Sequence, residues 1–263
     1  MSAVAAALVG WAVMAAVMTA GWIYQRARRN AGVVDLLWSL GTGLMGVWFA
    51  WVAEGDPARR VLVGGIAGLW GLRLGLHLAR RVFGEAEDVR YRKLRAMWGP
   101  RADVYLFLFF QLQASWTVLF ALPMLAAASN PAPGPRILDL AGLLIWAIAV
   151  AGEAIADRQL ARFRANPANR GQVCREGLWR YSRHPNYFFE WVHWWAYVPL
   201  GLGGHWGWLT LAGPALMLFF LLKITGIPPT EARALESRPE AYREYQRTTS
   251  AFFPWPPRRG GSR

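Results

Sequence analysis

The chain has 263 residues, of which 55% are hydrophobic and 17% charged, and it carries 16 tryptophans and a formal net charge of +13. The length of its apolar runs argues against a soluble domain, and the single cysteine, Cys174, excludes an internal disulfide framework and a cysteine-based zinc site. A net positive charge can indicate nucleic-acid binding, and the positions of the charges along the chain decide whether it does so here.

Seven apolar stretches approach the roughly 20 residues that a helix needs to cross a bilayer. In chain order they are residues 2–24, 31–53, 61–83, 104–128, 137–160, 187–203 and 208–226. The first stretch has no positively charged segment before it and no clean cleavage site after it, so we interpret it as a span rather than a signal peptide. The sequence therefore predicts an all-α, polytopic membrane protein with seven transmembrane helices, forming a single domain over residues 1–263.

Lysine and arginine residues gather in alternate connecting segments. Of 29 in total, three lie at 26–29, seven at 80–101, seven at 158–183 and eight from Lys223 to the end. Because basic residues concentrate on the cytoplasmic side of membrane proteins, this distribution places the N-terminus outside and the C-terminus in the cytoplasm. Topology thus accounts for the charge, and we expect no nucleic-acid partner.

Three polar segments face the cytoplasm in this topology: the loops 80–102 and 158–186 and the tail 227–263. We expect them to cap the inner ends of the helices.

The third span has two different faces. Four glycines from Gly64 to Gly75 recur at spacings of four, three and four, which favours close packing against another helix. Arg73, His77 and Arg80 lie roughly 200° around the helix from that stripe. One face is therefore expected to pack against backbone, and the other to meet something polar.

Short catalytic motifs add little. The stretch from Gly41 to Gly46 matches GxGxxG, but it lies within an apolar span rather than between a strand and a helix, so it does not indicate dinucleotide binding. No Walker loop, GxSxG or HExxH motif is present, and we expect no metal.

Ionisable residues within spans are costly and indicate function. Those that we single out are Asp35, Arg73, His77, Glu153 and Asp157, and, near the cytoplasmic ends, Glu190 and Lys223. Buried ion pairs that fix helix register are one explanation; a polar cavity shared by several helices is the other. A cavity accounts better for so many groups on five different spans, so we favour it.

The stretch GLWRYSRHPNYFFE, residues 177–190, places polar groups at the start of an apolar segment. A residue before proline leaves the α region and proline suits the first helical position, so a helix is expected from about Asn186. Its free N–H groups, next to Arg180, Arg183 and His184, suit a phosphate or pyrophosphate. Asn186 and Glu190 share a face that can bond an amide or a ribose. The alternative is a phospholipid headgroup clamp or simple anchoring by positive charge.

This stretch, together with LKITGIPPTE (222–231) and YREYQRTTSAFFPWPP (242–257), resembles the bacterial DUF1295 family. That family belongs to the steroid 5-alpha-reductase C-terminal superfamily, beside sterol C14 reductases and isoprenylcysteine methyltransferases. The likeness continues upstream through VDLLWSLG (34–41), WGLRLGLHLARR (70–81) and GEAEDVRY (84–91). It implies a seven-helix fold in the bacterial inner (cytoplasmic) membrane that binds NADPH from the cytoplasm and reduces an activated carbon–carbon double bond.

The resemblance implies a cofactor-binding part over residues 150–257. Aligned without gaps from 153 to 190, the chain places Asp157, Arg164, Asn186 and Glu190 at cofactor-binding positions of the steroid reductases. The full set of expected cofactor residues is Asp157, Arg164, Arg180, Arg183, His184, Asn186, Tyr187, Glu190, Lys223, Glu231, Tyr242 and Tyr245. Two positions depart from that family: Glu153 stands where it has Asn, and Phe189 replaces a Gly.

The resemblance also implies a catalytic pair. His77 falls where steroid reductases have a tyrosine that polarises the enone carbonyl, and Asp35 is the counterpart of their glutamate. A donor aimed at that oxygen stabilises the charge that hydride transfer builds, and a carboxylate holds imidazole in one tautomer. We therefore expect His77 supported by Asp35 as the donor, and Trp38 and Arg73 beside the substrate.

Three functions remain in competition. The first is an NADPH-dependent reductase of a lipophilic, steroid-like substrate. The second is an S-adenosylmethionine-dependent lipid or prenyl methyltransferase, which shares the RHPxY element; that branch typically has a Glu-Glu pair, whereas Ala232 follows Glu231 here. The third is a non-enzymatic lipid-binding protein. The expected partners are the lipophilic substrate and membrane lipid, with the chain a monomer or a weak homo-oligomer.

Overall fold

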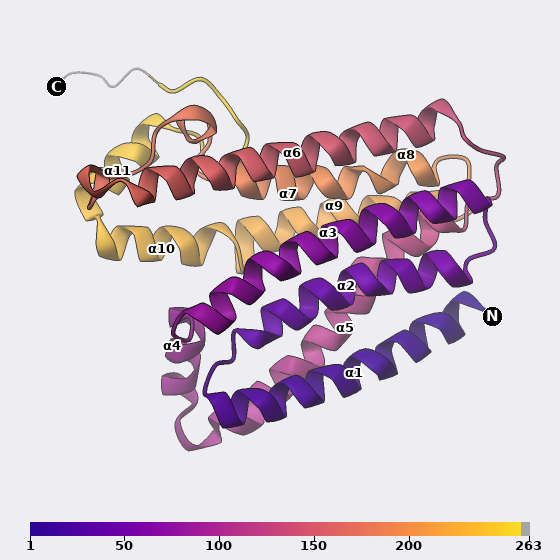
Figure 1. The fold of residues 1–263 in the computed structure, drawn as a ribbon, viewed down its shortest axis with the longest axis horizontal. Coiled ribbons are helices and arrows are strands. Elements are labelled where there is room, and N and C mark those ends of the chain that lie inside the picture. The colour runs from indigo at the N-terminus through magenta and orange to yellow at the C-terminus, as the bar shows by residue number, and fades with distance from the viewer. Residues whose placement is uncertain (259–263) are drawn as a thin grey trace. The chain divides into compact units, whose positions relative to one another are not determined.

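The computed structural model describes residues 1–258, so positions 259–263 of the predicted tail lie outside the described residues. The described chain is helical throughout, with no strand. Its α-helices are α1 (Ala3–Arg28), α2 (Val33–Val52), α3 (Pro57–Gly84), α4 (Val89–Trp98), α5 (Ala102–Ala128), α6 (Ile137–Ala165), α7 (Pro185–Trp195), α8 (Tyr197–Gly201), α9 (Ala212–Phe219), α10 (Ile227–Ser237) and α11 (Pro239–Thr248). Figure 1 shows their order, and the all-α prediction is confirmed.

Within residues 1–258, six helical segments are long and apolar enough to cross a membrane. They are Ala3–Arg28, Val33–Val52, Pro57–Gly84, Val89–Ala128, Ile137–Ala165 and Gly207–Ser237. The seventh predicted span, 187–203, is divided between α7 and α8 at Ala196. Pro199 explains the break, because proline lacks the N–H that would bond to the Trp195 carbonyl and its ring clashes with that carbonyl.

The chain forms two compact units, one built from Met1–Leu140 with Tyr197–Gly213 and the other from Ala141–Ala196 with the residues from Pro214 onward. We call them unit 1 and unit 2 and describe each by itself. The boundaries between the two units fall within α6, between α7 and α8, and within α9.

In unit 1, α2 and α3 pack backbone against backbone (Figure 1). A Cβ added to Gly71 would lie 2.7 Å from the Gly43 Cα, and one added to Gly75 would lie 2.3 Å from the Leu40 side chain. The glycine stripe of the third span is thus a packing surface, as predicted. Gly43 belongs to the GxGxxG match, which is a helix-packing feature here.

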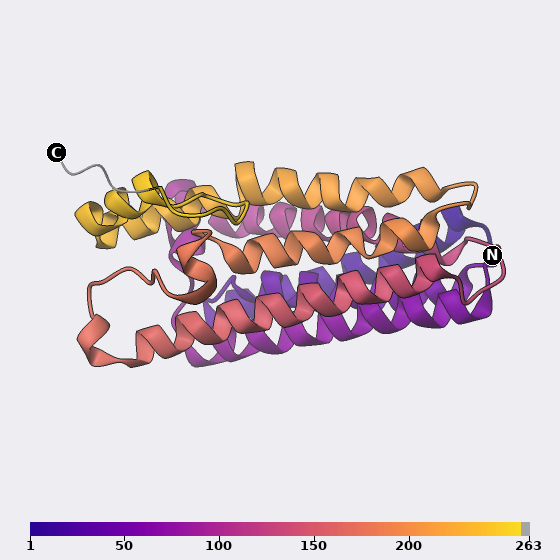
Figure 2. The ribbon, with the colours of Figure 1, turned by 90° about the horizontal axis from the view of Figure 1, so that it is seen from above.

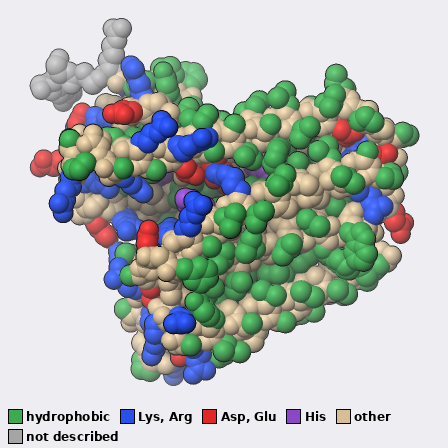
Figure 3. Space-filling model, viewed as in Figure 1, with side chains coloured by type: hydrophobic (Ala, Val, Ile, Leu, Met, Phe, Trp, Pro, Cys, Tyr) green, Lys and Arg blue, Asp and Glu red, His purple; other side chains and the backbone are tan. Residues whose placement is uncertain are grey.

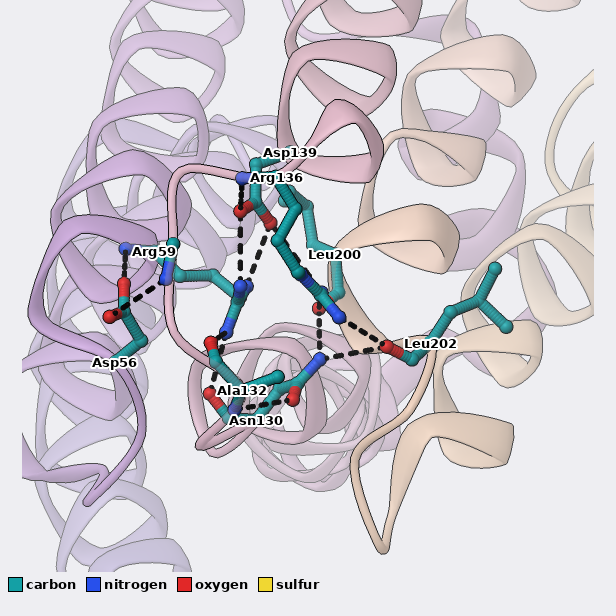
Figure 4. Close-up of polar contacts among 9 residues, drawn as sticks. Asp56, Arg59, Asn130, Ala132, Arg136, Asp139, Leu200 and Leu202 are labelled. Atoms are coloured by element: carbon teal, nitrogen blue, oxygen red, sulfur yellow. Dashed lines mark hydrogen bonds and ion pairs between the residues drawn. The ribbon is translucent and has the colours of Figure 1, made fainter.

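One end of unit 1 is held together by a buried arginine (Figure 4). Arg59, which the sequence places among loop charges, is only 1% exposed. Its Nε and Nη2 donate to the Asp139 carboxylate at 2.8 and 3.0 Å, and its Nη1 donates to the carbonyls of Asn130 and Ala132 at 2.7 and 2.8 Å. Arg59 therefore connects the start of α3, the segment after α5 and the start of α6.

The outer flank of unit 1 is apolar. Leu44, Trp51, Val61 and Leu69 are each more than half exposed, and Figure 3 shows hydrophobic side chains along this flank, with Lys and Arg gathered near α4. Soluble proteins rarely expose contiguous apolar patches of this kind. The surface is that of a membrane protein.

In unit 2, α6 and α7 run alongside one another (Figures 1 and 2). Their close approach depends on Gly152, where an added Cβ would lie 2.4 Å from the Phe189 ring. The loop after α6 folds back on it, because the Trp179 indole donates to the Ala156 carbonyl at 2.9 Å and Trp179 clusters with Phe163 and Cys174. The Phe189 ring is thus accommodated by a glycine on the facing helix.

Candidate functional site

The site begins with a contact between α6 and α7. Asn186 Nδ2 donates to Asp157 Oδ1 at 3.3 Å. One turn farther along each helix are Glu153 and Glu190, both buried with 8% exposure, and the Trp194 indole donates to Glu190 at 3.2 Å. Glu153 and Asp157 are four residues apart on α6, Asn186 and Glu190 are four residues apart on α7, and the Asn186–Asp157 contact joins the two helices.

The first turn of α7 presents backbone donors beside this contact. His184 has the extended φ of −139° that a following proline imposes, and Pro185 occupies the first helical position. The first intrahelical bond runs from the Phe188 N–H to the His184 carbonyl at 3.0 Å. The N–H groups of Asn186 and Tyr187 have no carbonyl one turn earlier in the helix to bond, so they form the positive end of the helix dipole.

The sequence suggests that Arg183 and His184 are available to bind a phosphate. In the structure both side chains contact other residues of the chain instead. Arg183 Nε donates to Glu231 at 2.7 Å, and its Nη1 donates to the carbonyls of Gln246 and Thr249 at 3.2 and 2.6 Å. His184 Nε2 lies 3.2 Å from the same Glu231 oxygen. Glu231 is therefore a structural anchor that ties α10 and the tail to the start of α7.

The tail tyrosines complete this anchor. Tyr242 donates to Glu231 at 3.2 Å, and Tyr245 donates to the carbonyl of Trp179 and lies 3.2 Å from that of Ser182. Burial raises the pKa of both phenols above the ordinary value near 10, so both remain donors at physiological pH. Tyr187 stacks on His184 with ring centroids 5.3 Å apart, and its hydroxyl lies 3.0 Å from that of Thr230.

Three further predicted cofactor residues have exposed side chains. Arg164, Arg180 and Lys223 are exposed. Lys223 belongs to a π-helical turn, Phe220–Ile224, between α9 and α10.

The expected pairing of His77 with Asp35 is not formed. Asp35 accepts from the Arg90 guanidinium at 2.9 Å and from the Tyr91 hydroxyl at 2.7 Å. His77 is exposed on α3, with no hydrogen bond or ion pair to another residue within 1–258. Asp35 therefore fastens α4 to the start of α2. Local sequence patterns do not indicate this pairing, because Arg90 and Tyr91 lie 55 and 56 residues away.

Trp38, a predicted substrate residue, packs edge to face against Phe120 and Trp70, with ring centroids 5.4 and 6.3 Å away. Its indole nitrogen is buried without a hydrogen-bond partner among residues 1–258. Arg73 is half-buried on α3. An unpaired buried donor is a candidate contact for a polar substrate group.

Gln246 is the participant that sequence reasoning missed. Its amide donates to Glu231 Oε2 at 2.7 Å. It lies four residues after Tyr242 on α11, so both side chains project from one helical face towards the same carboxylate. That i, i+4 spacing was the available signal.

The helices and this polar anchor define the chain as a multi-helix membrane protein. The family model described as "Protein of unknown function (DUF1295)" matches residues 21–249, which is most of the chain. The protein belongs to the DUF1295 family. Neither the curated proteins nor the solved structures gave a match.

Proposed function

We propose that the protein is a membrane-embedded, NADPH-dependent reductase of an activated carbon–carbon double bond in a lipophilic, steroid-like substrate. The observation that supports this most is the Asn186–Asp157 contact at the start of α7, with buried Glu190 one turn farther on. An amide, a carboxylate and a helix N-terminus together offer donors and acceptors that suit the ribose, the carboxamide and the phosphates of a nicotinamide dinucleotide.

The residues fit such a group chemically. Asn186 donates through Nδ2 to Asp157, and the amide oxygen of Asn186 and the carboxylate oxygens of Asp157 are acceptors by their chemistry. Hydroxyl and carboxamide donors of the cofactor match these acceptors. When bound, NADPH supplies the hydride for the β-carbon of the double bond and is oxidised to NADP⁺, while a proton adds to the α-carbon.

We propose that His77 donates to the carbonyl oxygen as negative charge develops there, because a positioned donor lowers the barrier to hydride transfer. Trp38 and Arg73 are the proposed substrate contacts. Asp35 is assigned no part in orienting His77, since Arg90 and Tyr91 hold its carboxylate.

The proposal includes seven crossings of the bacterial inner membrane, with the N-terminus outside. In this topology residues 187–203 form the seventh crossing, and the Arg183–Glu231 anchor precedes it on the cytoplasmic side. Monomers suffice, because every proposed site residue lies in one chain.

A ligand panel tests the proposal. In detergent, NADPH at 100 times its Kd should stabilise the folded protein by about 2.7 kcal/mol, as any ligand selective for the folded state does. NADH and S-adenosylmethionine are the comparisons. Stabilisation by S-adenosylmethionine with none from NADPH would instead favour the methyltransferase, and stabilisation by neither would leave a lipid-binding protein.

A further inference from the structure

The C-terminal tail of unit 2 closes over a hollow of about 320 Å³. Three backbone bonds shape it: Arg258 N–H to Thr248 at 2.8 Å, Arg183 N–H to Ser250 at 2.8 Å, and Trp255 N–H to Tyr181 at 2.9 Å. Ligand pockets typically measure about 300–1,000 Å³. The hollow therefore has room for a compact polar group.

Its lining is strongly basic. Arg183, Arg247 and Arg258 contribute to the walls, and no carboxylate does within the described chain. Arg183 is held by Glu231, but the side chains of Arg247 and Arg258 make no hydrogen bond or ion pair to another described residue. Clusters of arginines with available donors bind phosphate, because the guanidinium fork matches its oxygens. Figure 3 shows Lys and Arg side chains gathered at the α10–α11 end of unit 2.

Aromatic side chains stand beside these arginines. Trp255, which lines the hollow, is 70% exposed, and Phe253 is 52% exposed. Phe253 also packs against Trp191 on α7, with centroids 5.6 Å apart. Exposed tryptophan beside basic residues is the pattern that membrane proteins present to the headgroup region of a bilayer. A soluble phosphate ester would give no reason to expose these rings.

We propose that the tail hollow is a binding site for the phosphate headgroup of an anionic phospholipid, with Arg247 and Arg258 as the principal ligands and Phe253 and Trp255 in contact with the acyl region. The site is separate from the Asn186–Asp157 contact and does not depend on the reductase function. The tail packs against α7, and the bound lipid would anchor the tail to the membrane surface.

The test measures retention of lipid by native mass spectrometry, with phosphatidylglycerol as the anionic probe and phosphatidylcholine as the neutral one. Phosphatidylglycerol should be retained preferentially by the full-length protein. The double substitution Arg247→Gln/Arg258→Gln should lower its affinity roughly 30-fold, since each arginine near an anionic surface contributes about a five-fold preference. If the double variant does not fold, each single substitution should lower the affinity for phosphatidylglycerol by about five-fold.

The matched control is Arg243→Gln, an exposed arginine on α11 that does not line the hollow. Its retention of phosphatidylglycerol should equal that of the unmodified chain. If it lost as much lipid as the double variant does, surface charge alone would attract the lipid, and the proposed site would be refuted. The substitution of Phe253 and Trp255 by alanine should weaken retention of the lipid but not of glycerol phosphate. If inorganic phosphate or NADP⁺, added at a concentration equal to its own Kd, displaced the lipid, the hollow would be a site for a soluble phosphate ester and not for a lipid.

Discussion

Removing the Asp139 carboxylate should destabilise the protein severely. The Arg59 side chain is fully buried and that of Asp139 is 6% exposed, so the pair is shielded from water. Asp139→Asn leaves a charged guanidinium without its counter-ion, and breaking a buried ion pair in this way costs about 3–5 kcal/mol. The carbonyls of Asn130 and Ala132 still accept from Arg59, which places the expected loss near 3 kcal/mol rather than at the top of that range.

The assay is equilibrium unfolding in detergent, followed by circular dichroism. Glu244→Gln is the control, because the Glu244 side chain is 54% exposed in its pair with Arg175 and should contribute little. The double substitution Arg59→Met/Asp139→Leu removes both charges and should recover much of the loss. An Asp139→Asn protein within about 0.5 kcal/mol of the parent would refute the reasoning that burial makes this pair essential.

Two further outcomes are expected. Gly152→Ala should destabilise unit 2 by about 1–3 kcal/mol, because the new methyl group overlaps the Phe189 ring; pairing it with Phe189→Leu should restore part of the loss in the same unfolding assay. Burial lowers the pKa of His184 below its usual 6.5, against the opposing effect of Glu231. The unfolded chain therefore binds the proton first, and stability should fall as pH drops below about 6.5. His184→Gln should flatten this part of the Tm–pH curve and His205→Gln should not; equal curves for all three proteins would exclude the titration.

Features that depend on residues close together in the sequence could be predicted from it. The apolar runs predicted six of the spans, the glycines from Gly64 to Gly75 predicted the α2–α3 contact, and Pro185 predicted the start of α7. The polar residues within the spans predicted a shared polar cavity, and one contact between such residues on different helices, Asn186 to Asp157, is present.

Contacts between side chains far apart in the sequence could not be predicted from such patterns. Arg183 meets Glu231 48 residues later and Arg59 meets Asp139 80 residues later, and nothing in either neighbourhood specifies the partner. The positive-inside count treats every arginine as a solvated charge, so it could not identify Arg59 as buried. Asp35 was assigned to His77 by resemblance, whereas its nearest donors come from α4.

The central claim is that the start of α7 and the facing turn of α6 bind a nicotinamide dinucleotide, and the most direct test is the affinity for NADPH of three variants. Asn186→Ala and Asp157→Asn should each weaken binding by about 10-fold or more, because hydrogen bonds to charged groups contribute about 1.5–3 kcal/mol. Asp103→Asn, the same chemical change in unit 1, should leave the affinity unchanged. An unaltered Kd in both site variants, with NADPH still bound by the unmodified chain, would contradict the account.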